Sequence, residues 1–381
     1  MTASTHSTPA TGQPAKSRFP QLDGIRGLAI LMVVGWHYFY SQLNFDGPLP
    51  RAVKIAAHAC SLLWSGVDLF FVLSGFLITG ILLDELRAKN LLSVFYLRRA
   101  ARILPLYFLV LTAAAVGYGL VGHDPRFEPL FAHFPPVWSF LTFTQNILMA
   151  IQGGFAGPFL GMTWSLAVEE QFYLVWPWVV LLFAKSRRGL VVLTLLLCLL
   201  APGLRLLVSS FTAFVNTPFR MDSLLFGALA AMIFRDAAMT GFLKAHRTLF
   251  HLAFAGLAPL VGLLLYRPGA LGVWNHFVLG ALYFGGLLYS LLFDESALSC
   301  WLSTGWLRWV GSVSYALYMF HEPIGGCLNA LILGPGFSII TLPGVAVTLL
   351  SLCLSFGAAA LSGRFFEAWF LRLGKRARYK F

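Results

Sequence analysis

Residues 21–40, QLDGIRGLAILMVVGWHYFY, form the stretch that decides the fold of this 381-residue chain. Twenty mostly apolar residues are enough for one helix to cross a bilayer. The stretch also contains two ionisable residues, Arg26 and His37. Their spacing of eleven residues is about three helical turns, so they share one face and lie about 16 Å apart along the axis. Ionisable residues are costly inside a membrane, so this pair indicates a reaction or a transport pathway.

Apolar segments of similar length recur along the rest of the chain. Hydrophobic residues make up 58% of the sequence and charged residues only 11%, whereas soluble domains average about 25% charged residues. The sequence therefore predicts an all-α polytopic membrane protein with about ten transmembrane helices around a central polar cavity. Segment 137–150 is short and polar, and is left as a re-entrant or interfacial piece. The predicted spans are 22–41, 60–83, 103–122, 163–184, 190–208, 221–235, 249–266, 271–293, 309–333 and 340–362.

The distribution of Lys and Arg predicts the orientation of these helices. With ten spans and a cytoplasmic N-terminus, nineteen of these cations fall on the cytoplasmic side and five outside. Membrane insertion favours this bias, so both termini are expected in the cytoplasm. We expect a disordered leader at 1–20, an integral membrane domain at 21–370 and a basic tail at 371–381 that suits anionic lipids.

Other features exclude several function classes. The net charge of +12 follows from the topology bias, and no basic stretch with interleaved aromatic residues suggests binding to nucleic acid. The five cysteines are scattered and have no histidine at metal-ligand spacing. They therefore indicate neither a disulfide framework nor a metal site.

Arginines are expected to gather near the cytoplasmic face. Arg26 lies in the first span, and Arg99 and Arg102 lie in FYLRRAARILPLY, which we expect to be a loop before the third span. Guanidinium groups bind phosphate in a bidentate manner. The topology bias explains most cytoplasmic cations, but it leaves the arginine inside a span without a reason. The group therefore favours an anion site.

A second set of polar residues is expected at similar depth toward the outer face. Facing lipid would be costly, so these side chains should share one interior cavity. The serine and the glutamate of TWSLAVEEQ are four positions apart and share a helix face. Simpler roles remain open: a packing histidine, ion pairs for the charged residues, and a helix kink at the HEP sequence. The set comprises His37, Asp68, one of the adjacent Glu169 and Glu170 with Glu169 favoured, Arg220, Asp222 and His321, together with Trp164 and Ser165 close to Glu169 on the same helix.

Six motifs occur in the order found in a known family. FPQLDGIRGLAILMVVGWHYF has an arginine and a histidine in an Arg-x10-His motif, and RRAARILPLY has an Arg-x-x-Arg motif. GVDLFFVLSGFLIT, TWSLAVEEQFYLVWP, RMDSLLFGALAA and SYALYMFHEP follow the family's later blocks. From about residue 18 to about residue 370, the chain resembles the membrane-bound acyltransferase family 3, the O-antigen acetylase-like integral membrane acyltransferases.

The resemblance implies an activity and a location. It implies transfer of an acyl group, usually acetyl, from cytoplasmic acyl-coenzyme A to a hydroxyl on the far side of the bacterial inner membrane. The implied acceptors are sugars of exported polysaccharides, lipid-linked glycans among them, and macrolides. A fused periplasmic esterase-like domain, which some members carry, is not expected here.

The resemblance also gives roles to the residues. Arg26, Arg99 and Arg102 would bind the phosphates of the donor, whose thin pantetheine arm would pass through a helix-lined channel. His37 would act as general base on the acceptor hydroxyl, with Glu169 or Asp68 holding its tautomer. A covalent acyl-histidine is the other mechanism left open. Residues expected to bind substrate are Trp164, Ser165, Arg220, Asp222 and His321.

Two other classes of protein are compatible with the same residues. In a proton-coupled transporter or a lipid or glycan flippase, the buried charges would form a proton relay. In a structural membrane scaffold, they would matter for stability alone.

Overall fold

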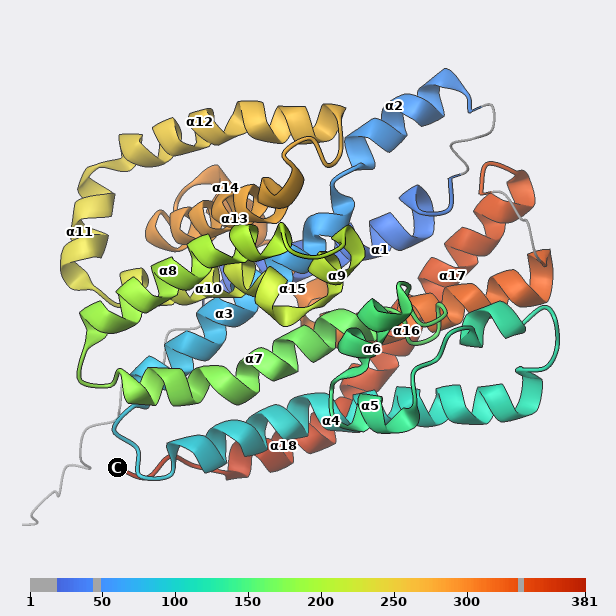
Figure 1. The fold of residues 1–381 in the computed structure, drawn as a ribbon, viewed down its shortest axis with the longest axis horizontal. Coiled ribbons are helices and arrows are strands. Elements are labelled where there is room, and N and C mark those ends of the chain that lie inside the picture. The colour runs from blue at the N-terminus through green and yellow to red at the C-terminus, as the bar shows by residue number, and fades with distance from the viewer. Residues whose placement is uncertain (1–18, 44–48, 335–338) are drawn as a thin grey trace, which may run out of the picture.

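The computed structural model describes residues 19–43, 49–334 and 339–381, and every regular element in these ranges is a helix (Figure 1). The predicted all-α class is thus confirmed, while the leader predicted at 1–20 lies almost wholly outside the described residues. Three π-helical segments, η1 (Trp36–Tyr40), η5 (Asn329–Leu333) and η6 (Ser362–Glu367), extend α1, α16 and α17. In chain order the α-helices are α1 (Pro20–Gly35), α2 (Arg51–Cys60), α3 (Gly66–Asp84), α4 (Leu91–Val121), α5 (Val137–Leu141), α6 (Gln145–Gln152), α7 (Thr163–Leu182), α8 (Arg187–Arg205), α9 (Ser210–Val215), α10 (Thr217–Phe234), α11 (Ala237–Ala245), α12 (Arg247–Tyr266), α13 (Asn275–Leu292), α14 (Ala297–Leu302), α15 (Gly305–Ser312), α16 (Ser314–Leu328), α17 (Leu342–Leu361) and α18 (Ala368–Arg376).

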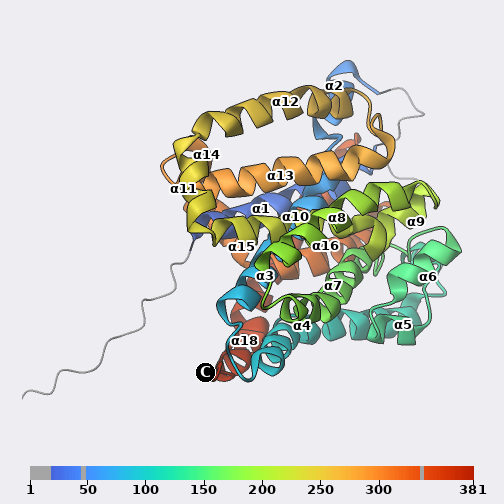
Figure 2. The ribbon, with the colours of Figure 1, turned by 60° about the vertical axis from the view of Figure 1, so that its left-hand side comes forward.

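Helices α3 and α10 cross at the centre of the molecule because glycines let their backbones approach closely. A Cβ on Gly75 would lie 1.8 Å from the carbonyl oxygen of Leu224, and one on Gly227 would lie 1.9 Å from that of Val72. Small residues serve this purpose in membrane helices, where tight packing takes over from the hydrophobic effect. Figure 2 shows α12 at one edge of the molecule, α4 with α18 at the opposite edge, and α1, α3 and α10 between them.

Seven helical stretches of the described residues are long and apolar enough to cross a membrane, fewer than the ten predicted. Three predicted spans are missing from this set: α1 with η1, α7, and α16 with η5. Joined to their π-helical extensions, α1 and α16 are long enough to span, as is α7, so these three differ from the seven by their polar residues, such as the two adjacent glutamates of α7. These three helices and α4 carry the charged residues of the two cavities described below, apart from Arg126, which lies in the loop after α4. The seven stretches are Arg51–Asp84, Leu91–Val121, Arg187–Arg205, Ser210–Phe234, Arg247–Tyr266, Gly272–Leu292 and Leu342–Arg376.

Two local predictions change. Helix α4 begins at Leu91, so the Arg-x-x-Arg motif lies inside a helix and the predicted loop is wrong. The prediction placed the motif in a loop because it took the cationic residues to mark the end of a membrane span. Segment 137–150 forms α5 and most of α6, helices of five and eight residues, which are too short to cross a bilayer.

The basic tail is held against α4. Helix α17 continues through η6 into α18, so the predicted tail at 371–381 is helical as far as Arg376. Beyond it, the side-chain amide of Asn90 donates to the carbonyl of Arg378 at 3.0 Å, and its oxygen accepts from the amide of Lys380 at 2.8 Å. Figures 1 and 2 both show α18 beside α4, with the C-terminus near the start of α4.

Candidate functional site

Three arginines of two helices line one cavity, which we call the arginine cavity. Arg26 comes from α1, and Arg99 and Arg102 come from successive turns of α4; Glu169 of α7 also lines it. The cavity has a volume of about 100 Å³. Its other walls are mostly apolar and include Phe70, Phe71, Leu73, Leu77, Ile103 and Leu166.

The charges in this cavity are anchored by neighbouring side chains. Nη1 of Arg26 donates to Asp23 at 3.2 Å. The carboxylate of Glu169 accepts from the hydroxyls of Ser74 at 3.0 Å and Tyr173 at 2.8 Å. Among the lining residues that the structure describes, three cations therefore face a single carboxylate. The balance of charge favours an anionic ligand.

A second cavity lies at the other end of the first helix, and we call it the histidine cavity. It has a volume of about 250 Å³ and is lined by His37 of η1 and Glu322 of α16. η1 is a π-helical turn, a feature often found at functional sites. Further polar lining residues are Tyr38, Gln42, Arg126, Asn329, Thr348 and Ser351.

The hydrogen bonds of His321 fix the tautomer of His37. Nδ1 of the buried His321 lies 2.7 Å from the carbonyl oxygen of Tyr318 and 3.2 Å from that of Leu317. Carbonyls only accept, so this nitrogen must carry a proton, and in a neutral ring Nε2 then carries a lone pair. That Nε2 lies 3.1 Å from Nδ1 of His37 and accepts its proton as a hydrogen bond. Nε2 of His37 is consequently the basic nitrogen.

Glu322 is the carboxylate beside this basic nitrogen. Its Oε1 lies 3.5 Å from Nε2 of His37, and the two side chains are 18% and 27% exposed. The separation exceeds the 2.7–3.2 Å of a normal hydrogen bond, so the lone pair stays available to a ligand. An imidazolium formed there would be stabilised by the adjacent negative charge.

The two cavities are separate, and no described residue lines both of them. The channel expected for the pantetheine arm of the donor is not formed as one continuous cavity. Tyr318 lines the arginine cavity, and its hydroxyl is hydrogen-bonded to Ser165 and to the carbonyl of Met162. One turn further along α16, His321 contacts His37. The pair of hydroxyls therefore lies between the arginine cavity and the histidine cavity.

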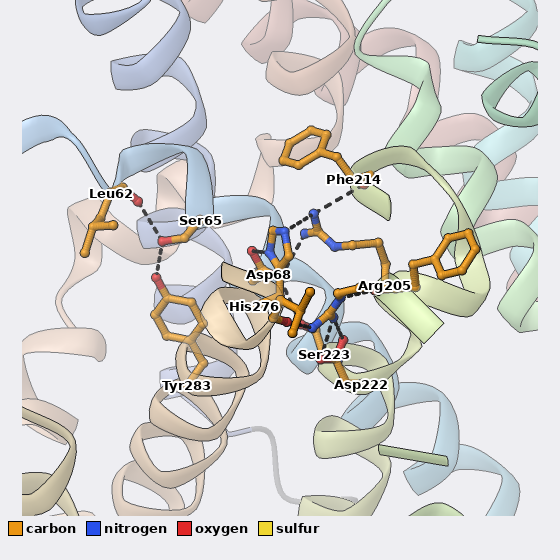
Figure 3. A network of polar contacts seen from close by, with 12 residues as sticks. Leu62, Ser65, Asp68, Arg205, Phe214, Asp222, Ser223, His276 and Tyr283 are labelled. Carbon is orange, nitrogen blue, oxygen red and sulfur yellow. Dashed lines mark hydrogen bonds and ion pairs between the residues drawn. The ribbon is translucent and has the colours of Figure 1, made fainter. Parts of the chain in front are cut away.

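A third group of polar residues is buried between α3, α8, α10 and α13 (Figure 3). Asp68 accepts from Nη2 of Arg220 at 2.9 Å and from the hydroxyl of Ser223 at 2.8 Å, and lies 3.3 Å from Nδ1 of His276. A second pair adjoins it: Nη2 of Arg205 lies 2.6 Å from both carboxylate oxygens of Asp222. We call these six residues the buried ion-pair network.

The predicted single outer cavity is therefore wrong. His37 and His321 meet, as expected of residues at similar depth. Glu169 and Ser165 instead line the arginine cavity, and Asp68 lies in the buried ion-pair network. The carboxylate beside His37 is accordingly neither of the two that were predicted.

The predicted substrate-binding residues on α10 lie elsewhere as well. Arg220 and Asp222 pair with Asp68 and Arg205 rather than with each other, and none of these four lines either cavity. The ring of Trp164 lies 5.5 Å from the guanidinium of Arg220, and it too is missing from both cavity walls. Depth along a helix does not determine which neighbouring helix a side chain faces.

Several residues of these sites were not predicted from the sequence. Glu322 directly follows His321 in SYALYMFHEP, and an acidic residue within a predicted span was a usable signal. Arg205 was likewise inside a predicted span. For His276 and Tyr318, no pattern in the sequence distinguishes them from residues that only pack between helices.

Comparison with known proteins identifies the family. A family model described as an acyltransferase domain matches residues 19–363. The chain is 27% identical over 386 residues to peptidoglycan O-acetyltransferase OatA of Listeria monocytogenes, covering 94% of this chain and 56% of that protein. It is 28% identical over 330 residues to O-acetyltransferase OatA of Staphylococcus aureus, covering 80% of this chain and 50% of that protein.

The chain thus spans about half the length of the curated relatives it matches. No solved structure matches it. The family match confirms the resemblance that the six motifs carry. With its long apolar helices, this chain is an integral membrane protein that belongs to the acyltransferase domain family, the membrane-bound acyltransferase family 3.

Proposed function

We propose that this chain is a transmembrane O-acyltransferase of the bacterial inner membrane. It transfers an acyl group, acetyl in the first instance, from cytoplasmic acyl-coenzyme A to a hydroxyl of an exported glycan. The observation that carries the proposal is the placing of Arg26 and His37 on one helix, each in its own polar cavity. The names of the relatives, which are O-acetyltransferases and in one case act on peptidoglycan, support this class of reaction and acceptor.

The arginine cavity suits the donor. Coenzyme A carries several phosphate charges and is made in the cytoplasm, where the positive-inside bias places the start of α1. Arg26, Arg99 and Arg102 offer bidentate donors to these phosphates. The apolar walls suit the uncharged pantetheine arm. Because Tyr318 and Ser165 separate the cavities, the arm must displace this pair of hydroxyls before the acyl group reaches His37.

The histidine cavity suits the acceptor. Nε2 of His37 takes the proton of the acceptor hydroxyl, and the hydroxyl oxygen bonds to the acyl carbon of the thioester. The carbon–sulfur bond breaks, and the proton then passes from His37 to the departing thiolate. Glu322 stabilises the charged ring during this step, and His321 keeps the basic nitrogen turned toward the cavity. General base catalysis of this kind contributes about 10²- to 10⁴-fold to rates.

Purified protein in proteoliposomes tests the proposal. Acetyl-coenzyme A labelled in its acetyl group is supplied on one side and peptidoglycan fragments or other glycans on the other. We expect labelled ester on the glycan together with free coenzyme A. Movement of unmodified glycan that is indifferent to acetyl-coenzyme A would instead indicate a transporter or a flippase.

Removing one arginine of the arginine cavity should weaken use of the donor. In Arg26→Gln and Arg102→Gln, we expect the KM for acetyl-coenzyme A to rise about tenfold, because each loses a charge-assisted hydrogen bond to phosphate. The KM for the acceptor should change less than twofold or so. Steady-state kinetics with each substrate varied in turn measures both effects.

Arg87→Gln is the matched control, since Arg87 is exposed between α3 and α4 and lines neither cavity. Its donor KM should equal that of the wild type. An unchanged donor KM in both arginine-cavity variants would contradict the assignment of this cavity to the donor.

A further inference from the structure

The histidine cavity contains one feature that acyl transfer itself does not use. Arg126 follows α4 in the loop that leads to η3 (Glu128–Phe131), and it lines the same cavity as His37 and Glu322. Among the described residues of this wall, it is the only side chain with a permanent positive charge. Removing a proton from a hydroxyl needs no cation, so we look to substrate binding for the role of Arg126.

Asp124 holds Arg126 in a fixed orientation. One carboxylate oxygen accepts from the backbone amide of Arg126 at 2.9 Å and from its Nε at 3.1 Å, and the other accepts from Nη2 at 2.7 Å. The carbonyl of Asp124 also accepts from the amides of Phe127 and Glu128, each at 2.9 Å. The side chain and the turn that carries it are thus positioned together, which lowers the entropic cost of binding a ligand.

The guanidinium retains binding capacity in this arrangement. Asp124 uses Nε and Nη2, whereas an arginine has five N–H donors, so within the part of the chain that the structure describes Nη1 is left over for a ligand. The Arg126 side chain is 55% exposed and therefore accessible from the cavity. Hydrogen bonds from Arg126 lower the pKa of Asp124 to about 2, so the supporting carboxylate is charged throughout the pH range of an assay.

The remainder of this wall suits a sugar. Gln42, Asn329, Thr348 and Ser351 are uncharged hydrogen-bonding side chains on three other segments of the chain. Uncharged polar groups of this kind bind hydroxyls and amides, while a single arginine is the usual partner of a carboxylate or phosphate. The cavity therefore combines groups for a neutral ring with one position for a negative charge.

We infer that Arg126 binds an anionic group, a carboxylate or a phosphate, on the acceptor, so that the histidine cavity selects acidic glycans over neutral ones. The inference rests on the proposed function, because it assigns the histidine cavity to the acceptor. Arg126 is in this view a specificity-determining residue: it sets which glycan binds and leaves the proton transfer at His37 unchanged. The simpler alternative is that the Asp124–Arg126 pair only holds the loop.

Paired acceptors test this inference. Three acceptors are compared. One oligosaccharide contains a hexuronic acid, the second contains the corresponding neutral hexose, and the third contains a sugar phosphate at the same position. For the wild type we expect kcat/KM to be about tenfold higher for an acidic acceptor, through KM. A preference for the acid, the phosphate or both tells which anion the site takes.

Arg126→Gln should abolish this preference: the ratio of kcat/KM for the acidic acceptor to that for the neutral one should fall from about ten to about one. Arg126→Lys should retain part of it, because the charge remains but bidentate binding is lost. Arg267→Gln is the matched control: Arg267 follows α12, is exposed and does not line the cavity. A loss of rate that is equal for acidic and neutral acceptors in Arg126→Gln would indicate the loop-holding role and overturn the inference.

Equilibrium binding of the same oligosaccharides, measured by titration calorimetry without donor, separates this inference from the proposed function. Absence of acyl transfer to every acceptor would contradict the proposed function alone. Equal binding of acidic and neutral oligosaccharides by the wild-type protein would contradict the inference, whatever the outcome of the transfer assay.

Discussion

Replacing His37 by glutamine should lower the rate constant for acyl transfer by at least about a thousandfold, because the acceptor hydroxyl then has no base of suitable pKa within reach. Glutamine is similar in length and its amide can still donate a hydrogen bond to His321, so the cavity should keep its shape. The KM for acetyl-coenzyme A should stay within about twofold of the wild type, since the arginine cavity is separate. Single-turnover transfer from labelled donor to glycan measures the loss.

His58→Gln is the matched control for this variant. His58 lies in α2, is exposed and lines neither cavity, so its substitution should leave the rate unchanged. Full transfer by the His37 variant would make the assignment of the base wrong. A label that stays on the wild-type protein when acceptor is withheld, and is missing from the His37 variant, would favour an acyl-histidine over direct transfer.

Sequence alone predicted those parts of the molecule that depend on one helix at a time. The apolar runs gave the all-helical class, because a chain in lipid must satisfy its backbone hydrogen bonds internally. The spacing of Arg26 and His37 placed them at opposite ends of one helix, and each now lines a cavity. Helical spacing likewise paired Arg99 with Arg102, which line one cavity together.

The parts that were mispredicted depend on how helices pack against each other. Asp68 and His37 were expected at similar depth, yet Asp68 faces α10 and α13 while His37 faces α16. Hydropathy and residue counts give depth along the membrane normal, but they contain no information about the direction in which a side chain points around the helix axis. That direction is set by close contacts such as Gly75 against Leu224, which only the three-dimensional structure shows.

Replacing Asp68 by alanine should therefore destabilise the protein rather than stop its chemistry. Asp68 and Arg220 are both fully buried and lie 2.9 Å apart. Without the carboxylate, the Arg220 guanidinium would remain inside the helix bundle with no negative partner except the already paired Asp222. Breaking a buried pair in this way costs about 3–5 kcal/mol. We expect the midpoint of thermal unfolding in detergent, followed by tryptophan fluorescence, to fall by at least about 5 °C.

Two further variants test whether burial of the ion pair causes this loss of stability. Asp84→Ala removes a carboxylate with similar geometry, at 2.7 Å from Arg235, but this side chain is 39% exposed. Its loss should cost no more than about 1 kcal/mol, since water screens the charge that remains. The double variant Asp68→Leu with Arg220→Met removes both buried charges, and should recover most of the stability because no unpaired ion is left. If Asp68→Ala unfolds at the wild-type temperature but transfers no acyl group, Asp68 acts in the reaction and the buried ion-pair network belongs to the active site.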